Sequence, residues 1–448
     1  MDVPTGRFLV SLGKTLLATV VSLMGFPLGA APGSPAPQQP SASSAAASSP
    51  RIAVGVELRL RDELRDNADF RSAEDFEHFL GYRLRLDLKF RLLEQLELFV
   101  QPQDVWLVDA DTDKVVHDLN TNLHQAWLAW RPGGSGRWEL QVGRQEFIYG
   151  EERLIGAFGW DNVGRAFDGA RLRRRSGAWT NDLFWARQVQ VRRGGARSRD
   201  GHLDLSGAYL TRVAADSPRR WEVYGLFLRD GLRTRGELLR QPGSTRLFTA
   251  GVRLVHRPPT GWRYSVENAW QLGERGPDAH RAAMLIVTAG HTWDVRGKPR
   301  WQLEYAFATG DNQPADGRAH EFHNLFPTNH LWYGYADLVG LRNLHALRGT
   351  LALTPHAKLT AELDLHAFWL AAARGPWKDA AGRVLGFDPT GRSGNEIGQE
   401  LDLTLRLPLS RHLHLLGGYS VFFPGTFARN TRGSALHHFG YLQTTLRF

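Results

Sequence analysis

The sequence lacks cysteine, long apolar runs and compact catalytic motifs. No cysteine occurs among its 448 residues, which excludes a disulfide framework, a cysteine-ligated metal and a thiol nucleophile. After residue 50, no uninterrupted apolar run reaches the roughly 18 residues that a transmembrane helix needs. The motifs H-E-x-x-H and G-x-S-x-G are also absent, so we expect neither a zinc nor a serine-hydrolase site and no cofactor.

The first 50 residues have the features of targeting and linker sequence. Positive charge precedes an apolar stretch at 16–28, and small residues follow it, which is typical of a secretory signal. A short buried helix is the alternative. Residues 32–50 are rich in Pro, Ala and Ser and predict a disordered linker. We therefore expect a signal peptide at 1–31, a linker at 32–50 and one folded domain at 51–448.

Positive charge exceeds negative charge only modestly. The net charge is +9, and the charged residues are spread along the chain rather than clustered. This distribution does not favour nucleic-acid binding. In an exported protein it favours contact with an anionic solute or with lipopolysaccharide.

From residue 51 onward, the dominant pattern is an alternation of apolar and polar residues. In residues 82–91, Tyr, Leu and Phe alternate with Arg, Asp and Lys, and residues 397–407 repeat the pattern. Alternation over about ten residues predicts a strand with one apolar and one polar face.

About eighteen such segments fit the length of this domain, since the strands of outer-membrane barrels take roughly ten residues each. They are expected to start near residues 51, 82, 96, 123, 138, 167, 181, 203, 221, 246, 262, 282, 301, 344, 358, 397, 413 and 439. The predicted fold is an all-β, transmembrane antiparallel barrel.

The connections between these segments alternate in length. Short, turn-rich ones lie at 131–137, 174–179, 215–219, 257–262, 294–299, 354–358 and 408–412. Longer ones lie at 62–81, 102–122, 147–166, 308–343 and 371–396. Short periplasmic turns and long outer loops are typical of bacterial outer-membrane barrels, whereas a propeller or a two-sheet sandwich would not separate loop lengths in this way.

Aromatic residues support a membrane location. Tryptophans expected near strand ends are Trp127, Trp130, Trp138, Trp221, Trp262, Trp293 and Trp301. Such rings prefer the membrane interface, although ordinary core aromatics are the alternative. The last predicted strand ends on Phe448, which resembles the signal read by the barrel assembly machinery.

Two segments carry a family resemblance. Residues 306–343 contain a TGD, a following DG, an LFPTNH and a YGYAD, and residues 143–172 begin with a GRQ. Both resemble the alginate-export family of outer-membrane proteins, and the resemblance extends from Arg51 to Phe448.

The resemblance implies an eighteen-stranded, monomeric barrel that passes an anionic polysaccharide or oligosaccharide outward through a basic, constricted pore. The family's exporter has a longer periplasmic segment near the end of the barrel, where this chain has only PLSRH (408–412). Gating by such a segment is therefore not expected here.

Residues opposite the apolar faces should line a water-filled lumen. The predicted cationic pathway consists of Arg59, Arg61, Arg83, Arg85, Lys89, Arg91, Arg144, Arg171, Arg173, Arg253, Arg263 and Arg406, with the facing of Arg144 uncertain because of Gly143. The predicted inward acids are Glu304, Glu362, Asp364, Glu400 and Asp402. A single arginine could select anions or merely brace the wall by pairing with an acid; for the whole set, a net cationic lumen is expected.

The residues that match the family loop are Gly310, Asp311, Asp316, Gly317, Phe326, Pro327, His330, Gly334, Asp337 and Asn343. This loop could fold inward and narrow the pore, or it could simply be held in shape by its own hydrogen bonds. For Asp311 and Asn329 the second interpretation is preferred.

A metal site is not expected. DADTD (109–113) resembles the start of a calcium loop but lacks glycine at the sixth place, and the histidines are scattered. Three functions remain in competition: a channel for anionic glycans, a porin for small acidic solutes, and, ranked last, a barrel enzyme.

Overall fold

The computed structural model describes most of the chain after residue 50. The described residues are 51–71, 76–109, 121–133, 136–192, 195–198, 203–215, 217–235, 242–313, 316–379 and 381–448. The expected signal peptide and linker lie outside them.

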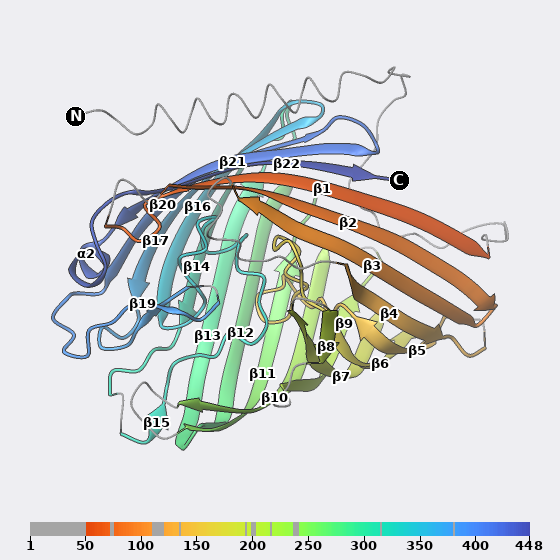
Figure 1. Cartoon of the computed structure of the whole chain (residues 1–448), viewed down its shortest axis with the longest axis horizontal. Coiled ribbons are helices and arrows are strands. Elements are labelled where there is room, and N and C mark those ends of the chain that lie inside the picture. Colours follow the sequence, from red (N-terminus) through yellow and green to blue (C-terminus); the bar gives the residue numbers. More distant parts are fainter. Residues whose placement is uncertain are drawn as a thin grey trace.

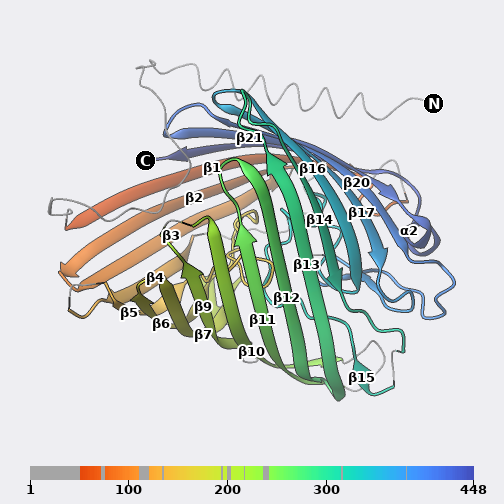
Figure 2. The same ribbon diagram turned by 180° about the vertical axis from the view of Figure 1, so that it is seen from behind.

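Eighteen antiparallel strands form a closed barrel (Figures 1 and 2). The first nine are β1 (Ile52–Asp66), β2 (Phe76–Leu93), β3 (Leu96–Asp109), β4 (Asn122–Trp130), β5 (Trp138–Gln145), β6 (Phe167–Ser176), β7 (Trp179–Arg192), β9 (Asp204–Val213) and β10 (Arg219–Arg235). The other nine are β11 (Pro242–His256), β12 (Gly261–Arg275), β13 (Asp278–Thr292), β14 (Arg300–Ala308), β16 (Leu344–His356), β17 (Leu359–Leu370), β20 (Glu396–Pro408), β21 (Leu413–Pro424) and β22 (His437–Arg447).

The remaining elements are short and lie in connections: β8 (Gly195–Ser198), β15 (Arg318–Ala319), β18 (Trp377–Lys378), β19 (Val384–Gly386) and α2 (Thr426–Thr431). No helix in the described part of the chain is long and apolar enough to cross a membrane.

The first and last strands close the barrel. β1 pairs with β22 from Glu57↔Arg447 to Asp66↔His438, and the two strands lie side by side in Figure 1. The backbone of Val56 exchanges two further hydrogen bonds with Phe448 (3.1 and 3.0 Å). Closure leaves no free sheet edge, which a lipid environment could not satisfy.

Every predicted strand is present in the wall, and most starts agree within a few residues. The largest differences are at β2, which begins six residues before position 82, and at β11 and β13, which begin four residues before positions 246 and 282. The extension of β2 lies at a strand end joined by a longer connection, where loop composition ends the visible alternation before hydrogen bonding ends, whereas β11 and β13 follow shorter connections.

The connections separate into two ends of the barrel, as predicted, with two exceptions in length, the connections from β10 to β11 (236–241) and from β12 to β13. Short turns lie at one end, here called the turn end, and longer connections lie at the other, the loop end. The connection between β12 and β13 belongs to the loop end but contains only residues 276–277. Gly276 adopts φ +62° there, which a tight hairpin turn requires.

The outer surface is apolar, with aromatic rings near the turn end. Trp130, Trp138, Trp221, Trp262 and Trp293 are all exposed there. Trp127 is an exception to the predicted belt, because it stacks on the buried ring of Phe99 with 5.0 Å between ring centroids.

Three connections from the loop end turn back into the barrel: loop A (146–166), loop B (309–343) and loop C (371–395). Their apolar side chains form one buried cluster with inward-facing wall residues, for example Phe147 of loop A with Leu247 of β11. Figure 1 shows loop A between the walls of the barrel, whereas β15 of loop B lies at the loop end beside the start of β13. The protein core is therefore inside the lumen.

Candidate functional site

Loops A and B dock on each other inside the lumen. Ile155 forms a β-bridge with Phe326, and the Gly156 N–H donates to the Phe326 carbonyl at 2.9 Å. The Thr328 hydroxyl donates to Glu152 at 2.7 Å. The two segments that carry the family resemblance thus meet and form one unit.

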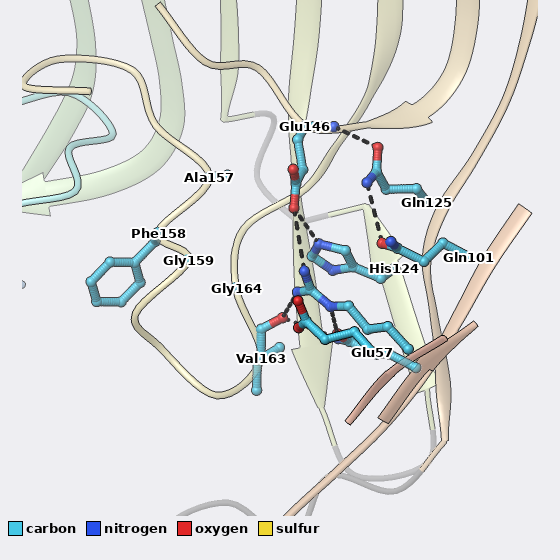
Figure 3. Close-up of polar contacts among 12 residues, drawn as sticks. Glu57, Gln101, His124, Gln125, Glu146, Ala157, Phe158, Gly159, Val163 and Gly164 are labelled. Carbon is cyan, nitrogen blue, oxygen red and sulfur yellow. Dashed lines mark hydrogen bonds and ion pairs between the residues drawn. The ribbon is translucent and has the colours of Figure 1, made fainter. Parts of the chain in front are cut away.

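The arginines of β1 and β2 hold the tip of loop A through its backbone. Arg59 donates to the carbonyls of Gly159 (2.8 Å) and Asp161 (2.9 Å). Arg85 donates to the carbonyl of Val163 (3.1 Å). Figure 3 shows this part of loop A, with Gly159, Val163 and Gly164. A guanidinium with several donors in a fixed fork suits several carbonyls at once.

Charged partners complete this contact. Arg83 pairs with Glu57 at 2.7 Å. Glu146, at the start of loop A, contacts His124 at 2.8 Å (Figure 3). Arg61 donates to the Trp160 carbonyl and lies 4.1 Å from the centre of its ring. These four predicted cations, Arg59, Arg61, Arg83 and Arg85, are buried and engaged with loop A.

A second arginine cluster holds loop A from the opposite wall. Arg253 of β11 contacts Glu151 of loop A (3.0 Å), Glu222 (2.7 Å) and Glu267 (3.5 Å). Burial by itself would raise the pKa of Glu151, but Arg153, Arg253 and Arg257 together lower it to about 2. Glu151 therefore stays ionised at neutral pH and ties loop A to the wall.

Arg153 of loop A is more deeply buried than Arg59, Arg83 or Arg253. Its side chain is 1% exposed. It donates to Glu304 of β14 at 2.5 Å and to the Tyr333 hydroxyl at 3.1 Å, and it lies 4.0 Å from the Trp332 ring centre. Arg153 thus joins loop A, loop B and the wall.

The family residues at the start of loop B shape its path. Asp311 accepts hydrogen bonds from the backbone N–H groups of Gln313 (2.8 Å) and His320 (2.9 Å). These are bonds within loop B, as expected if Asp311 helps to hold the loop in shape. Asp316 accepts from the Arg318 N–H at 2.8 Å. Gly317 has φ +86° and accepts from the backbone of β13.

Gly310 and Asn343 bring the two ends of loop B together. A Cβ on Gly310 would lie 1.7 Å from the Asn343 amide oxygen, so only glycine fits. Asn343 also accepts from the Ala372 N–H at 2.7 Å and donates to the Ala372 carbonyl at 3.1 Å. These contacts attach loop B to loop C.

Loops B and C are also joined by a buried ion pair. Lys378 donates to both oxygens of Glu321 at 2.6 and 2.7 Å. Burial opposes ionisation, but Lys378, Arg275 and Arg342 lower the pKa of Glu321 to about 2. Burial lowers the pKa of Lys378 to about 8.

The later family residues pack inside the barrel. Phe326 meets Phe167 edge to face at 5.2 Å, and the Pro327 carbonyl accepts from Arg165 at 3.0 Å. His330 stacks on the Trp160 ring at 3.8 Å and contacts Asp337 at 2.8 Å.

Gly334, with φ +88°, lies against Glu400, so that a Cβ would be 2.3 Å from a carboxylate oxygen. This is one of the contacts through which the inward acids hold the loops. Glu400 accepts from the Ala336 N–H of loop B at 2.8 Å, and Asp402 contacts His366 at 3.2 Å.

The other predicted acids pair with arginines. Asp364 accepts from Arg348 at 2.8 Å, and Glu362 pairs with Arg300 at 2.6 Å. All five predicted acids thus lie on the inner face.

Six predicted cations lie nearer the turn end and stay at least partly exposed: Lys89, Arg91, Arg171, Arg173, Arg263 and Arg406. Arg173 chelates Asp182 at 2.7 and 2.6 Å. Arg171 donates to Gln141 at 2.6 Å.

Arg263 stands apart from the others. It faces inward on β12 between the outward-facing Trp262 and Tyr264, and it makes no hydrogen bond or ion pair with any described residue. Its charged neighbours are Arg300, Arg257 and Glu151. It is an available cation in a basic part of the inner wall.

The prediction for Arg144 is wrong. Gly143, with φ +128°, does not reverse the alternation, so buried Gln141 and Gln145 face inward and Arg144 faces outward. There it forms a bidentate pair with Asp168 (2.8 and 3.1 Å).

Sequence reasoning missed five residues of the site: Glu151, Arg153, Trp160, Glu222 and Glu267. The first three lie in the segment that resembles the family, and the last two have inward parity on β10 and β12. What the sequence did not reveal was the fold of loop A, which brings them together.

Metal sites are not found among the described residues, where no three His, Asp or Glu side chains are grouped to hold an ion. Most of the DADTD segment lies outside the described residues.

Solved structures of similar fold include outer-membrane proteins of Pseudomonas aeruginosa. OccK8 (OprE) has a TM-score of 0.60 and 11% identity over 89% of this chain and 98% of that one. OccK3 (OpdO) has 0.58 and 13% over 89% and 95%. OpdK, solved with vanillate, has 0.56 and 10% over 88% and 98%. This likeness shows the fold alone.

No curated protein matches the sequence. The family model described as "Alginate export" matches residues 51–441, which include both docked loops and almost all of the wall. The fold and this match are those of outer-membrane channels, and the chain belongs to the alginate export family.

Proposed function

We propose that the protein is an outer-membrane channel that passes an anionic polysaccharide or oligosaccharide through its lumen. The half of the lumen toward the turn end, which is the periplasmic half, is basic. The observation that carries the proposal is the unpaired, inward-facing Arg263 beside Arg257 and Arg300. Arginine binds carboxylates in a planar, bidentate way, so uncompensated arginines in a pore favour anions. No catalytic role is inferred.

Conduction through a planar bilayer tests this proposal. The refolded protein should be anion-selective in a salt gradient, and oligouronates should block the current. Arg263→Gln removes a charge-assisted hydrogen bond to a carboxylate of the oligouronate, worth about 1.5 kcal/mol. The concentration of oligouronate that blocks the current should therefore rise about tenfold.

A matched control is Arg174→Gln. Arg174 is exposed on the outer face, where it lies 5.5 Å from the Trp138 ring centre, so its removal changes the net charge equally but not the lumen. Cation selectivity of the unchanged protein, or equal effects of the two variants, would contradict the proposal.

A porin for small acidic solutes is the second candidate. Two observations favour it: loops fill much of the lumen, and a protein of similar fold was solved with vanillate, a small carboxylate. Titration with uronates of increasing length separates the two functions. If monomers pass and longer oligomers neither pass nor block, the porin interpretation holds and the polymer interpretation fails.

A further inference from the structure

The lipid-facing surface carries a row of charged side chains across seven strands, from β5 to β12. Each residue stands directly opposite the next on the neighbouring strand, in the order Arg144, Asp168, Arg187, Asp204, Arg229, Arg246 and Glu274. We call this set the outer charged row. The strands that carry its last members, β10 to β12, lie side by side in Figure 2.

The row faces outward. Two positions from Arg229 and Arg246 on the same strand faces are the exposed rings of Phe227 and Phe248. The intervening Leu228 and Leu247 are buried in the barrel interior. Arg229 and Arg246 are therefore on the membrane-facing side.

The height of these arginines matches the edge of the membrane. Arg229 lies eight positions beyond Trp221, the aromatic ring of the periplasmic end on the same face. Eight residues at about 3.3 Å each, tilted by about 40°, rise about 20 Å. The apolar band of such barrels is about 25 Å tall, so Arg229 and the paired Arg246 lie within about 5 Å of its outer edge, where a long arginine side chain can extend to the outer-leaflet headgroups.

The signs of the charges alternate along the row except at one place. Arg187 chelates Asp204 at 2.6 and 3.1 Å, whereas Arg229 and Arg246 follow as two cations in succession. Like charges directly opposite on neighbouring strands are destabilising. Neither guanidinium makes a hydrogen bond or ion pair within the described part of the chain, even though Glu274 stands beyond Arg246.

We propose that Arg229 and Arg246 bind a phosphate group of lipopolysaccharide in the outer leaflet. A phosphate between two guanidinium groups would remove their repulsion and accept bidentate hydrogen bonds from each. The adjacent exposed rings of Phe227 and Phe248 would contact the acyl chains of the same molecule. Free phosphate could not make that second contact, which is why the lipid is the chosen ligand. This inference does not depend on the solute that the channel passes.

Thermal unfolding of the full-length barrel in detergent tests the site. Purified bisphosphorylated lipid A should raise the Tm by at least about 2 °C more than dephosphorylated lipid A does. The double variant Arg229→Gln, Arg246→Gln should lose that difference. Heat-modifiable migration on gels first establishes that the variant is folded; the single variant Arg246→Gln replaces it if it is not, with a partial loss expected.

The control is the pair Arg174→Gln, Arg212→Gln. These arginines lie on the same outer face but at the periplasmic rim, next to the rings of Trp138 and Trp179. They should leave the lipid A effect unchanged. The proposal is overturned if the phosphate-dependent difference survives in the Arg229 and Arg246 variants, if the control abolishes it, or if inorganic phosphate alone stabilises the protein as much as lipid A.

Discussion

The half of the lumen toward the loop end, which is the extracellular half, is filled by loop side chains. The half toward the turn end, which is the periplasmic half, is lined by wall side chains that keep contact with solvent. On the extracellular side, Leu228, Leu247 and Leu344 face inward and are buried beneath the loops. On the periplasmic side, the side chains of Lys89 and Arg406 are 49% and 38% exposed.

Arginine side chains therefore have different roles in the two halves of the lumen. Arginines in the middle of the barrel and toward the loop end bind groups of the protein. Arg59 of the wall donates to a carbonyl of loop A, and Arg153 of loop A donates to Glu304 of the wall. Arginines near the periplasmic mouth keep donors available, and Arg263 is the clearest case. Inward parity alone does not distinguish a brace from a solute contact.

The largest effect is expected from Arg153→Met, which attacks the loop-filled half. Among the described residues, it leaves the buried carboxylate of Glu304 with a hydrogen bond from only the Thr288 hydroxyl, at 3.2 Å. Breaking a buried ion pair costs about 3–5 kcal/mol. Chemical denaturation should show this loss, and limited proteolysis should cut loops A and B faster while the wall persists.

The control for that variant is Arg383→Met in loop C. Arg383 pairs with Asp379 at 2.6 Å, but its side chain is 81% exposed, so the effect should stay within experimental error. Equal losses for the two variants would mean that Arg153 does not anchor the loops.

The wall was predictable from sequence because its signals are local. Residues 82–91 show the two faces of a strand directly, and lipid on one side with polar side chains on the other enforces that alternation at every position. Even the polar parity was informative, since it placed Arg83 and Arg253 correctly on the inner face.

The loops were not predictable in the same way. Glu151 and Glu222 lie far apart in the sequence and meet through Arg253 only because loop A turns inward. No periodicity describes such a path, which depends on contacts with several strands at once. The family motifs located the right segments, but only the structure shows that they dock on each other.

An intermediate effect is expected from Gly310→Ala. The new methyl group would overlap the Asn343 amide, and overpacking of this kind costs about 1–3 kcal/mol. Gly349→Ala in the wall is the comparison, because its Cβ would meet only Leu303 at an ordinary 3.7 Å. Unfolding midpoints of both variants measure the difference. An unchanged midpoint for Gly310→Ala would show that the Asn343 side chain can move away without loss of stability.

Acid should loosen the loop-filled half through Glu151. Its pKa is about 2 in the folded protein against 4.5 for the free side chain, so its stabilising contribution is complete above about pH 4.5 and is lost as the pH falls toward 2. The stability difference between the unchanged protein and Glu151→Gln should therefore shrink over that range. Denaturation at pH 7, 4 and 2.5 measures it, and a constant difference would exclude ionised Glu151 as a tie.

The smallest effect, about 1 kcal/mol, is expected from Arg59→Lys, which keeps the charge but loses the fork that holds two carbonyls of loop A. Proteolysis near 159–161 should rise slightly, and the reversal potential should not change, because Arg59 is 3% exposed and committed to the loop. Arg59→Gln should then shift selectivity less than Arg263→Gln does. A shift of equal size would place Arg59 on the conduction path and would show that loop A leaves the middle of the lumen open to ions.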